Sequence, residues 1–166
     1  MDSPYRGLLF GAFEGGQTMD TKVRPYQLLC LVCGVGEGKG GELLEAVREA
    51  PDRPLRIVCN AGDVYVYQDP GTEGDTPEGA DYNRKRDLDI LQRMSWPPGI
   101  TLPARTALMM LIERIITVEG ICGYDAVTGE GWKGCAKARS GYYEQGRAKG
   151  IGAIIPLEGP YGTRPR

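Results

Sequence analysis

Residues 25–34 read PYQLLCLVCG and form a nearly continuous apolar run that contains Cys30 and Cys33. A run this short is compatible with either a helix or a strand. Pro25 favours a helix, because proline is common at the first helical position. Gly34 is expected to end this helix, since glycine is the usual residue just past a helix end. Residues 34–41, GVGEGKGG, then predict a flexible loop around Lys39.

Downstream of this loop, the pattern predicts a helix over Glu42–Ala50, with Leu43, Leu44 and Val47 on its apolar face and a proline after it. Leu55–Cys59 has the alternation typical of a strand, and so does Asp63–Tyr67. The segment NAG between them is typical of a turn. A β-hairpin is therefore expected here.

The second half of the chain predicts two longer helices. Asp81–Met94 places Leu88, Leu91 and Met94 on one face, with the basic triplet Arg84–Arg86 expected to face water. Thr101 is expected to cap a third helix that is apolar almost all round from Leu108 to Val118. Such a helix is buried on most sides. A glycine-rich loop from Cys122 to Cys135 and a short helix over Ser140–Ala148 complete the prediction.

These elements predict one α+β domain over residues 1–166, because 166 residues fit a single core. Three or four helices are expected around the small β-hairpin. The ends, residues 1–20 and 150–166, are rich in glycine and proline and predict extended arms. No apolar run reaches 18 residues, so a membrane helix is not expected.

The charge pattern bears on location and partners. A net charge of −2 argues against nucleic-acid binding by the protein as a whole. The start of the chain lacks the pattern of a secretory signal, and an odd number of cysteines does not suit a disulfide scaffold. We therefore expect a cytoplasmic protein. The basic stretch from Lys133 to the end is either a solvated surface or a docking site for an acidic partner or nucleic acid. The expected partner is a protein subunit.

The chain contains five cysteines and no histidine. Without imidazole, metal binding and acid–base chemistry must use thiolates, carboxylates, tyrosines or lysines. The cysteines are Cys30, Cys33, Cys59, Cys122 and Cys135, and three of them adjoin a glycine. A neighbouring glycine lets backbone approach closely and aim N–H groups at a sulfur, as thiolate sites require.

Four cysteines lie at the edges of predicted elements and form the candidate metal site, namely Cys30, Cys59, Cys122 and Cys135. Four thiolates suit a [4Fe–4S] cluster or zinc. The leucines around Cys30 and the isoleucine before Cys122 would supply a dry shell, which favours the cluster. Cys33 is then a spare ligand or a core residue. An electron-transfer or accessory subunit of a larger redox complex is the expected role.

Two other functions stay open at this point, and enzymatic activity is not decided. In one, the cysteines only fill the core and the protein is a structural or interaction subunit without a metal. In the other, the Gly34–Gly41 loop with Lys39 binds a nucleotide, as an apolar run followed by a glycine loop and a helix can do. The loop departs from the phosphate-binding pattern, because Cys33 and Gly40 occupy positions that call for glycine and serine or threonine.

The residues 23–31, VRPYQLLCL, and 36–40, GEGKG, resemble the opening of a small prokaryotic cysteine-rich family that has been suggested to bind iron–sulfur. The resemblance extends thinly over residues 22–145. It implies matching positions for Cys59, for Arg86-Asp87 and for the Cys122, Trp132 and Cys135 set. The family carries two histidines where this chain has Tyr26 and Gln27, and it carries further cysteines that are absent here. The resemblance therefore implies one site through Cys30, Cys59, Cys122 and Cys135, and no particular reaction.

Overall fold

A computed structural model describes residues 20–59, 80–123 and 134–156 of the chain. Its elements follow one another as β1 (Thr21–Val23), α1 (Pro25–Glu37), α2 (Glu42–Glu49), β2 (Pro54–Ile57), α3 (Ala80–Met94), β3 (Thr101–Pro103), α4 (Ala104–Arg114), a 3₁₀ helix (Ala136–Ser140), α5 (Tyr142–Ala148) and α6 (Ile151–Ile154). Helices beside a small sheet agree with the predicted α+β class.

Helix α1 begins at Pro25, as the sequence predicts. The backbone N–H of Arg24 donates to Gln27 Oε1 at 2.9 Å, which satisfies one donor at the helix start. The helix continues through Gly34 to Glu37 and is capped by Gly38, so the expected end at Gly34 is wrong. Gly38 adopts a left-handed conformation with φ of 79°, and Lys39 N donates back to Gly34 O at 2.8 Å. This closing turn needs a glycine at position 38.

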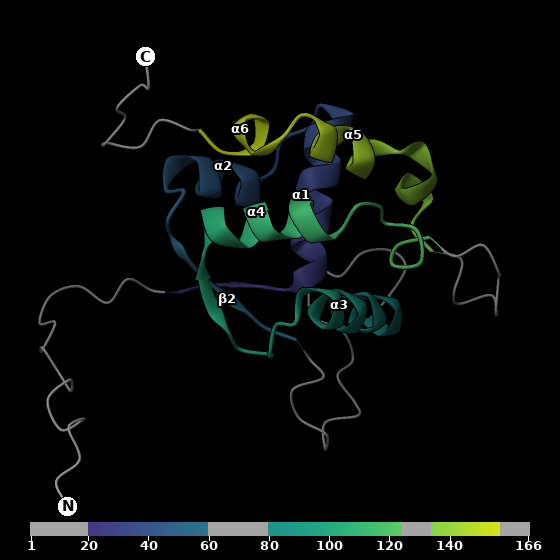
Figure 1. Cartoon of the computed structure of the whole chain (residues 1–166), viewed down its shortest axis with the longest axis horizontal. Coiled ribbons are helices and arrows are strands. Elements are labelled where there is room, and N and C mark those ends of the chain that lie inside the picture. Colours follow the sequence, from purple (N-terminus) through teal and green to yellow (C-terminus); the bar gives the residue numbers. More distant parts are fainter. Residues whose placement is uncertain (1–19, 60–79, 124–133, 157–166) are drawn as a thin grey trace, which may run out of the picture.

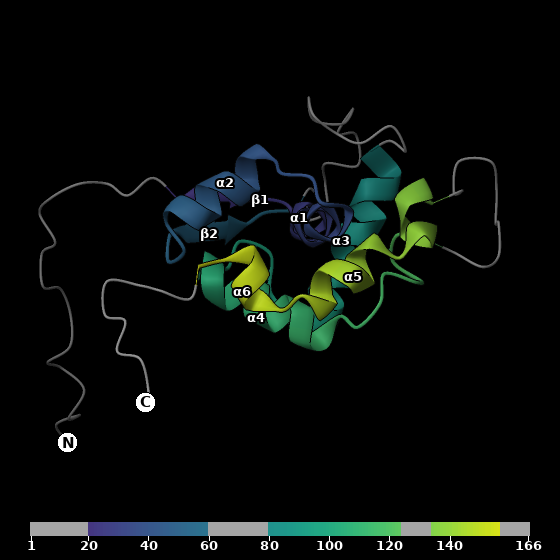
Figure 2. The ribbon, with the colours of Figure 1, turned by 90° about the horizontal axis from the view of Figure 1, so that it is seen from above.

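Helix α1 lies at the centre of the molecule (Figure 1). Figure 2 looks along α1 and shows α2 and the sheet on one side, α3 and α5 on the other, and α4 with α6 completing the ring. The burial of α1 agrees with this position, because seven of its thirteen residues are buried. The predicted apolar run is thus the core element around which the other helices pack.

The sheet has the order β1–β2–β3, with β1 parallel and β3 antiparallel to β2. Thr101 pairs with Arg56 of β2, so the prediction that Thr101 caps a helix is wrong. Thr101 belongs to β3, which pairs with β2, and the N-cap of α4 is Pro103. The second strand of the predicted hairpin, Asp63–Tyr67, lies outside the described residues. Both edges of β2 are occupied by β1 and β3.

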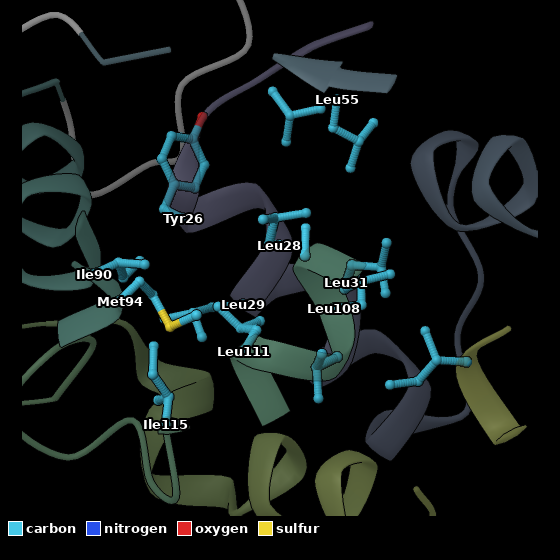
Figure 3. Packing of buried hydrophobic residues seen from close by; sticks show 14 of the residues in the cluster. Tyr26, Leu28, Leu29, Leu31, Leu55, Ile90, Met94, Leu108, Leu111 and Ile115 are labelled. Carbon is cyan, nitrogen blue, oxygen red and sulfur yellow. The ribbon is translucent and has the colours of Figure 1, made fainter. Parts of the chain in front are cut away.

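One hydrophobic core joins α1, α3, α4 and the sheet (Figure 3). Leu29 of α1, Met94 of α3 and Leu111 of α4 are at most 1% exposed and contribute to this cluster. Burying a side chain of this size stabilises the fold by about 1.5–3 kcal/mol. On α3 the expected apolar face is correct for Leu91 and Met94 and wrong for Leu88, which is 46% exposed.

Helix α4 differs from the prediction of a helix buried almost all round to Val118. It buries a single face, ends at Arg114, and leaves Met109 48% exposed. The residues 115–118, IITV, are β-branched and disfavour a helix, which explains the early end. Part of the expected C-terminal arm is also helical, because Ile151–Ile154 forms α6. Residues 1–19 and 157–166 lie outside the described ranges.

Helices α1 and α5 cross at two glycines. A Cβ added to Gly36 would lie 1.7 Å from Tyr142 O, and one added to Gly146 would lie 2.0 Å from Val32 O. Only residues without a Cβ fit at such distances. The hydroxyl of Tyr143 then donates to Ile115 O at 2.7 Å and fixes α5 to the segment after α4.

Candidate metal centre

The five cysteines lie on four segments of the fold. Cys30 and Cys33 belong to α1, Cys59 follows the end of β2, Cys122 lies in a turn, and Cys135 precedes the 3₁₀ helix. Cys30 is exposed, Cys122 is buried, and the other three are half-buried. Both exposed and protected thiols are therefore present.

Tyr82 of α3 connects Cys122 to Cys135. Its hydroxyl donates to Cys122 O and accepts a hydrogen bond of 3.0 Å from Cys135 N. Cys135 N also donates to Cys122 O at 2.7 Å. Gly134 makes this approach possible, since its φ is 76° and an added Cβ would lie 2.7 Å from Cys122 O. Gly134 thus permits the close backbone approach expected for a glycine beside a cysteine, although the Cys135 N–H donates to oxygen atoms and not, as expected, to a sulfur.

Replacing Tyr82 by phenylalanine is expected to lower the free energy of unfolding by about 1–2 kcal/mol, because a buried carbonyl and a backbone N–H lose a hydrogen-bond partner. Urea unfolding followed by circular dichroism measures the change. Tyr142→Phe is the matched control, with an expected change below about 0.5 kcal/mol, since Tyr142 is half-buried and outside this connection. Equal effects of the two substitutions would contradict the structural role of the Tyr82 hydroxyl.

Arg86 of α3 is 1% exposed, so the prediction that it faces water is wrong. Its guanidinium lies 4.6 Å from the ring centroids of both Tyr26 and Tyr82. Nη2 donates to Asn83 Oδ1, and Nη1 reaches Cys122 Sγ at 3.7 Å. The sequence alone predicts a solvated face for this basic triplet, because Tyr26 and Cys122, which contact Arg86, lie far from it in the sequence.

Asp87, the next residue, fixes the start of α1 to α3. Its two carboxylate oxygens accept from Arg24 Nε at 2.8 Å and from Tyr26 N at 2.8 Å. Burial raises the pKa of Asp87 to about 6, although the Arg24 charge and the two hydrogen bonds oppose this rise. Because Asp87 accepts from Tyr26 N, it holds the residue whose ring lies against the Arg86 guanidinium.

Four of the thiols act on one another electrostatically. Burial raises the pKa of Cys33 to about 11, and the charges of Cys30 and Cys135 add to the rise. Burial raises the pKa of Cys122 to about 12, against the lowering effect of Arg86, while Cys30 and Cys135 raise it further. In both cases burial is the largest cause of the raised pKa.

Cys59 lies two residues beyond the end of β2. Ile57 pairs with Val23 in the parallel β1–β2 ladder, and Val58 N donates to Val23 O at 2.9 Å. Since β1 continues directly into α1, Cys59 leaves the sheet on the side where α1 begins. Cys30 lies little more than one helical turn beyond that point. Among the described residues, no three His, Cys, Asp or Glu side chains stand close enough to hold a metal ion as they are placed.

The Gly34–Gly41 segment does not form the strand, loop and helix of a phosphate site. A helix precedes it, and residues 34–37 are still part of that helix. Lys39 is 67% exposed on its side chain and pairs with Glu37 at 2.8 Å. A surface pocket of about 240 Å³ lies between this turn and α1 and includes Cys30 and Lys39 in its lining.

Comparison of the chain with protein-family models, with curated proteins and with solved structures finds no match in any of the three. None of the helices within the described ranges has the length and apolar character needed to cross a membrane. The described residues form a small α+β fold in which the buried Arg86 contacts the Cys122 thiol.

Proposed function

We propose that the protein binds one metal centre, a [4Fe–4S] cluster ahead of zinc, through Cys30, Cys59, Cys122 and Cys135. Its role in this proposal is electron transfer, or an accessory function, within a larger cytoplasmic redox complex that includes a protein partner. The observation that carries the proposal is the joining of Cys122 and Cys135 through Tyr82, with the Arg86 cation against the Cys122 sulfur.

The surroundings of these thiols suit an iron–sulfur cluster. Cys122 is buried in the same hydrophobic cluster as the fully buried Ile121, which gives this thiol apolar surroundings. A dry shell with nearby N–H donors tunes the potential of such a cluster, which would supply one-electron redox chemistry when bound. Burial raises the pKa of the Cys122 thiol to about 12, so metal binding must displace its proton, and the Arg86 guanidinium lowers this cost.

An electron-transfer role also needs one side of the centre near the surface. Cys30 is exposed and lines a pocket of about 240 Å³ with Gln27 and Lys39. A redox partner that docks on this side would approach the centre more closely than from the buried Cys122 side. The protected and the exposed thiols thus have different roles, one in holding the centre and the other in access to it.

The test is anaerobic purification with iron, sulfide and zinc analysis and visible absorption. Wild-type protein is expected to be brown, to absorb near 400 nm and to contain about four irons and four sulfides per chain. Cys122→Ser, Cys135→Ser, Cys30→Ser and Cys59→Ser are each expected to lose most of the iron. A colourless wild-type protein with no bound metal would contradict the proposal, and one with a single zinc would favour the zinc site.

Cys33→Ser is the matched control, because Cys33 is a half-buried cysteine on the same helix as Cys30. The proposal expects Cys33→Ser to keep wild-type iron. If Cys33→Ser loses iron and Cys59→Ser keeps it, then Cys33 is the fourth ligand in place of Cys59. This comparison decides the donor set without any assumption about the reaction.

A further inference from the structure

The guanidinium of Arg86 is held in one orientation. The rings of Tyr26 and Tyr82 lie at 4.6 Å from it, and Asn83 accepts from Nη2. Such stacking is specific for a planar guanidinium and would not hold the ammonium group of a lysine in the same way. With these contacts made, Nη1 is directed at Cys122 Sγ, 3.7 Å away.

The charge of Arg86 acts on one of the proposed ligands. Its Nη1 contacts the sulfur of the buried Cys122 at 3.7 Å. Attraction between buried charges is several times stronger than in water, because the surrounding dielectric is low. The Asp87 carboxylate accepts from Arg24 and Tyr26, so its hydrogen bonds are directed to the start of α1.

We propose that Arg86 is a positioning residue of the metal centre: it holds the Cys122 sulfur by an N–H···S contact, and its fixed positive charge favours the reduced state of the centre. This inference rests on the proposed iron–sulfur function. A thiolate-ligated cluster carries negative charge, and reduction adds one more electron to it. A nearby cation and a hydrogen bond to sulfur both stabilise that added charge and raise the reduction potential.

Three variants of the anaerobically purified full chain test the inference by redox titration of the visible absorption. Arg86→Gln is expected to lower the midpoint potential by about 59 mV or more, which is a tenfold change in the ratio of oxidised to reduced protein for a one-electron couple. Arg86→Lys keeps the charge without the stacking and is expected to lie between wild type and Arg86→Gln. Arg93→Gln is the matched control, because Arg93 is on the same helix and exposed. Its midpoint is expected to stay at the wild-type value.

The outcomes separate this inference from the proposed function. Wild-type protein without iron overturns the proposed function, and the inference with it. Wild-type protein with a cluster, together with an Arg86→Gln midpoint equal to that of Arg93→Gln, overturns the inference alone. If Arg86→Gln does not fold, the side-chain N–H signals of ¹⁵N-arginine-labelled wild-type protein give the answer. Those of Arg86 are expected to shift on cluster reduction and those of Arg93 to stay, and no shift at Arg86 would overturn the inference.

Discussion

Replacing Gly146 by alanine is expected to lower the free energy of unfolding by about 3 kcal/mol or more. An alanine Cβ at this position would lie 2.0 Å from Val32 O and 2.9 Å from Gly36 N, far inside van der Waals contact. Both of the groups that it would meet are backbone atoms of α1, so no side-chain rotation can make room. Relief therefore requires α5 to move away from α1 as a whole.

Gly36→Ala tests the same crossing from the other helix. Its Cβ would lie 1.7 Å from Tyr142 O, and the expected loss of stability is equally large. Gly40→Ala is the control, because Gly40 is exposed and nothing lies within 4 Å of its added Cβ. Urea unfolding followed by circular dichroism measures all three variants. A midpoint for Gly146→Ala equal to that of Gly40→Ala would contradict the crossing.

The crossing also matters for the proposed metal centre. Helix α1 carries Cys30 and Cys33, and α5 follows the 3₁₀ helix that begins directly after Cys135. The distance between α1 and α5 thus helps to set how closely Cys135 approaches the cysteines of α1. A folded but shifted Gly146→Ala protein is therefore expected to retain less iron than Gly40→Ala.

Local sequence signals predicted the elements that depend on local chemistry. Pro25 and the apolar residues after it were sufficient to predict the central helix α1, and the helix from Glu42 was predicted to within one residue of its end. Gly34 was misread because glycine has two uses. It can end a helix, or it can lie inside one where another helix approaches closely, as Gly36 does here. At Gly34 itself the close neighbour is the turn that closes α1, because an added Cβ would lie 3.2 Å from Lys39 O.

Predictions that depended on distant residues failed for the same reason. Thr101 is a plausible helix cap until β2 is available to pair with it. Arg86 is a plausible solvated residue until Tyr26 and Cys122 are brought to it by the fold. The resemblance to the cysteine-rich family includes Arg86 and Asp87 among its matching positions, and it is the sequence signal that singles out these two buried polar residues. The four-cysteine hypothesis groups Cys122 with Cys135, and the structure brings the Cys135 N–H to Cys122 O and to the Tyr82 hydroxyl beside Gly134.

Replacing Asp87 by alanine is the second change with a large expected effect. Asp87 is fully buried, and its oxygens accept from Arg24 Nε and Tyr26 N. Alanine would remove both of these acceptors and leave a buried guanidinium without its carboxylate. Breaking a buried pair by removal of one partner costs about 3–5 kcal/mol. Asp89→Ala is the control on the same helix, since the Asp89–Lys85 pair is partly exposed and is worth about 0.5 kcal/mol or less.

The pH dependence of this effect follows from the raised pKa of Asp87. Burial raises this pKa from 3.8 to about 6, so the folded protein binds the Asp87 proton more tightly than the unfolded chain does. The contribution of Asp87 to the free energy of unfolding therefore falls as the pH rises from about 4 to about 6, and it is constant above that interval. The difference in stability between wild type and Asp87→Ala reports on Asp87, because the contributions of the other carboxyl groups cancel. This difference is expected to be largest below pH 4. A difference that grows with pH across the same interval would mean that Arg24 and Tyr26 N hold the carboxylate ionised against the effect of burial.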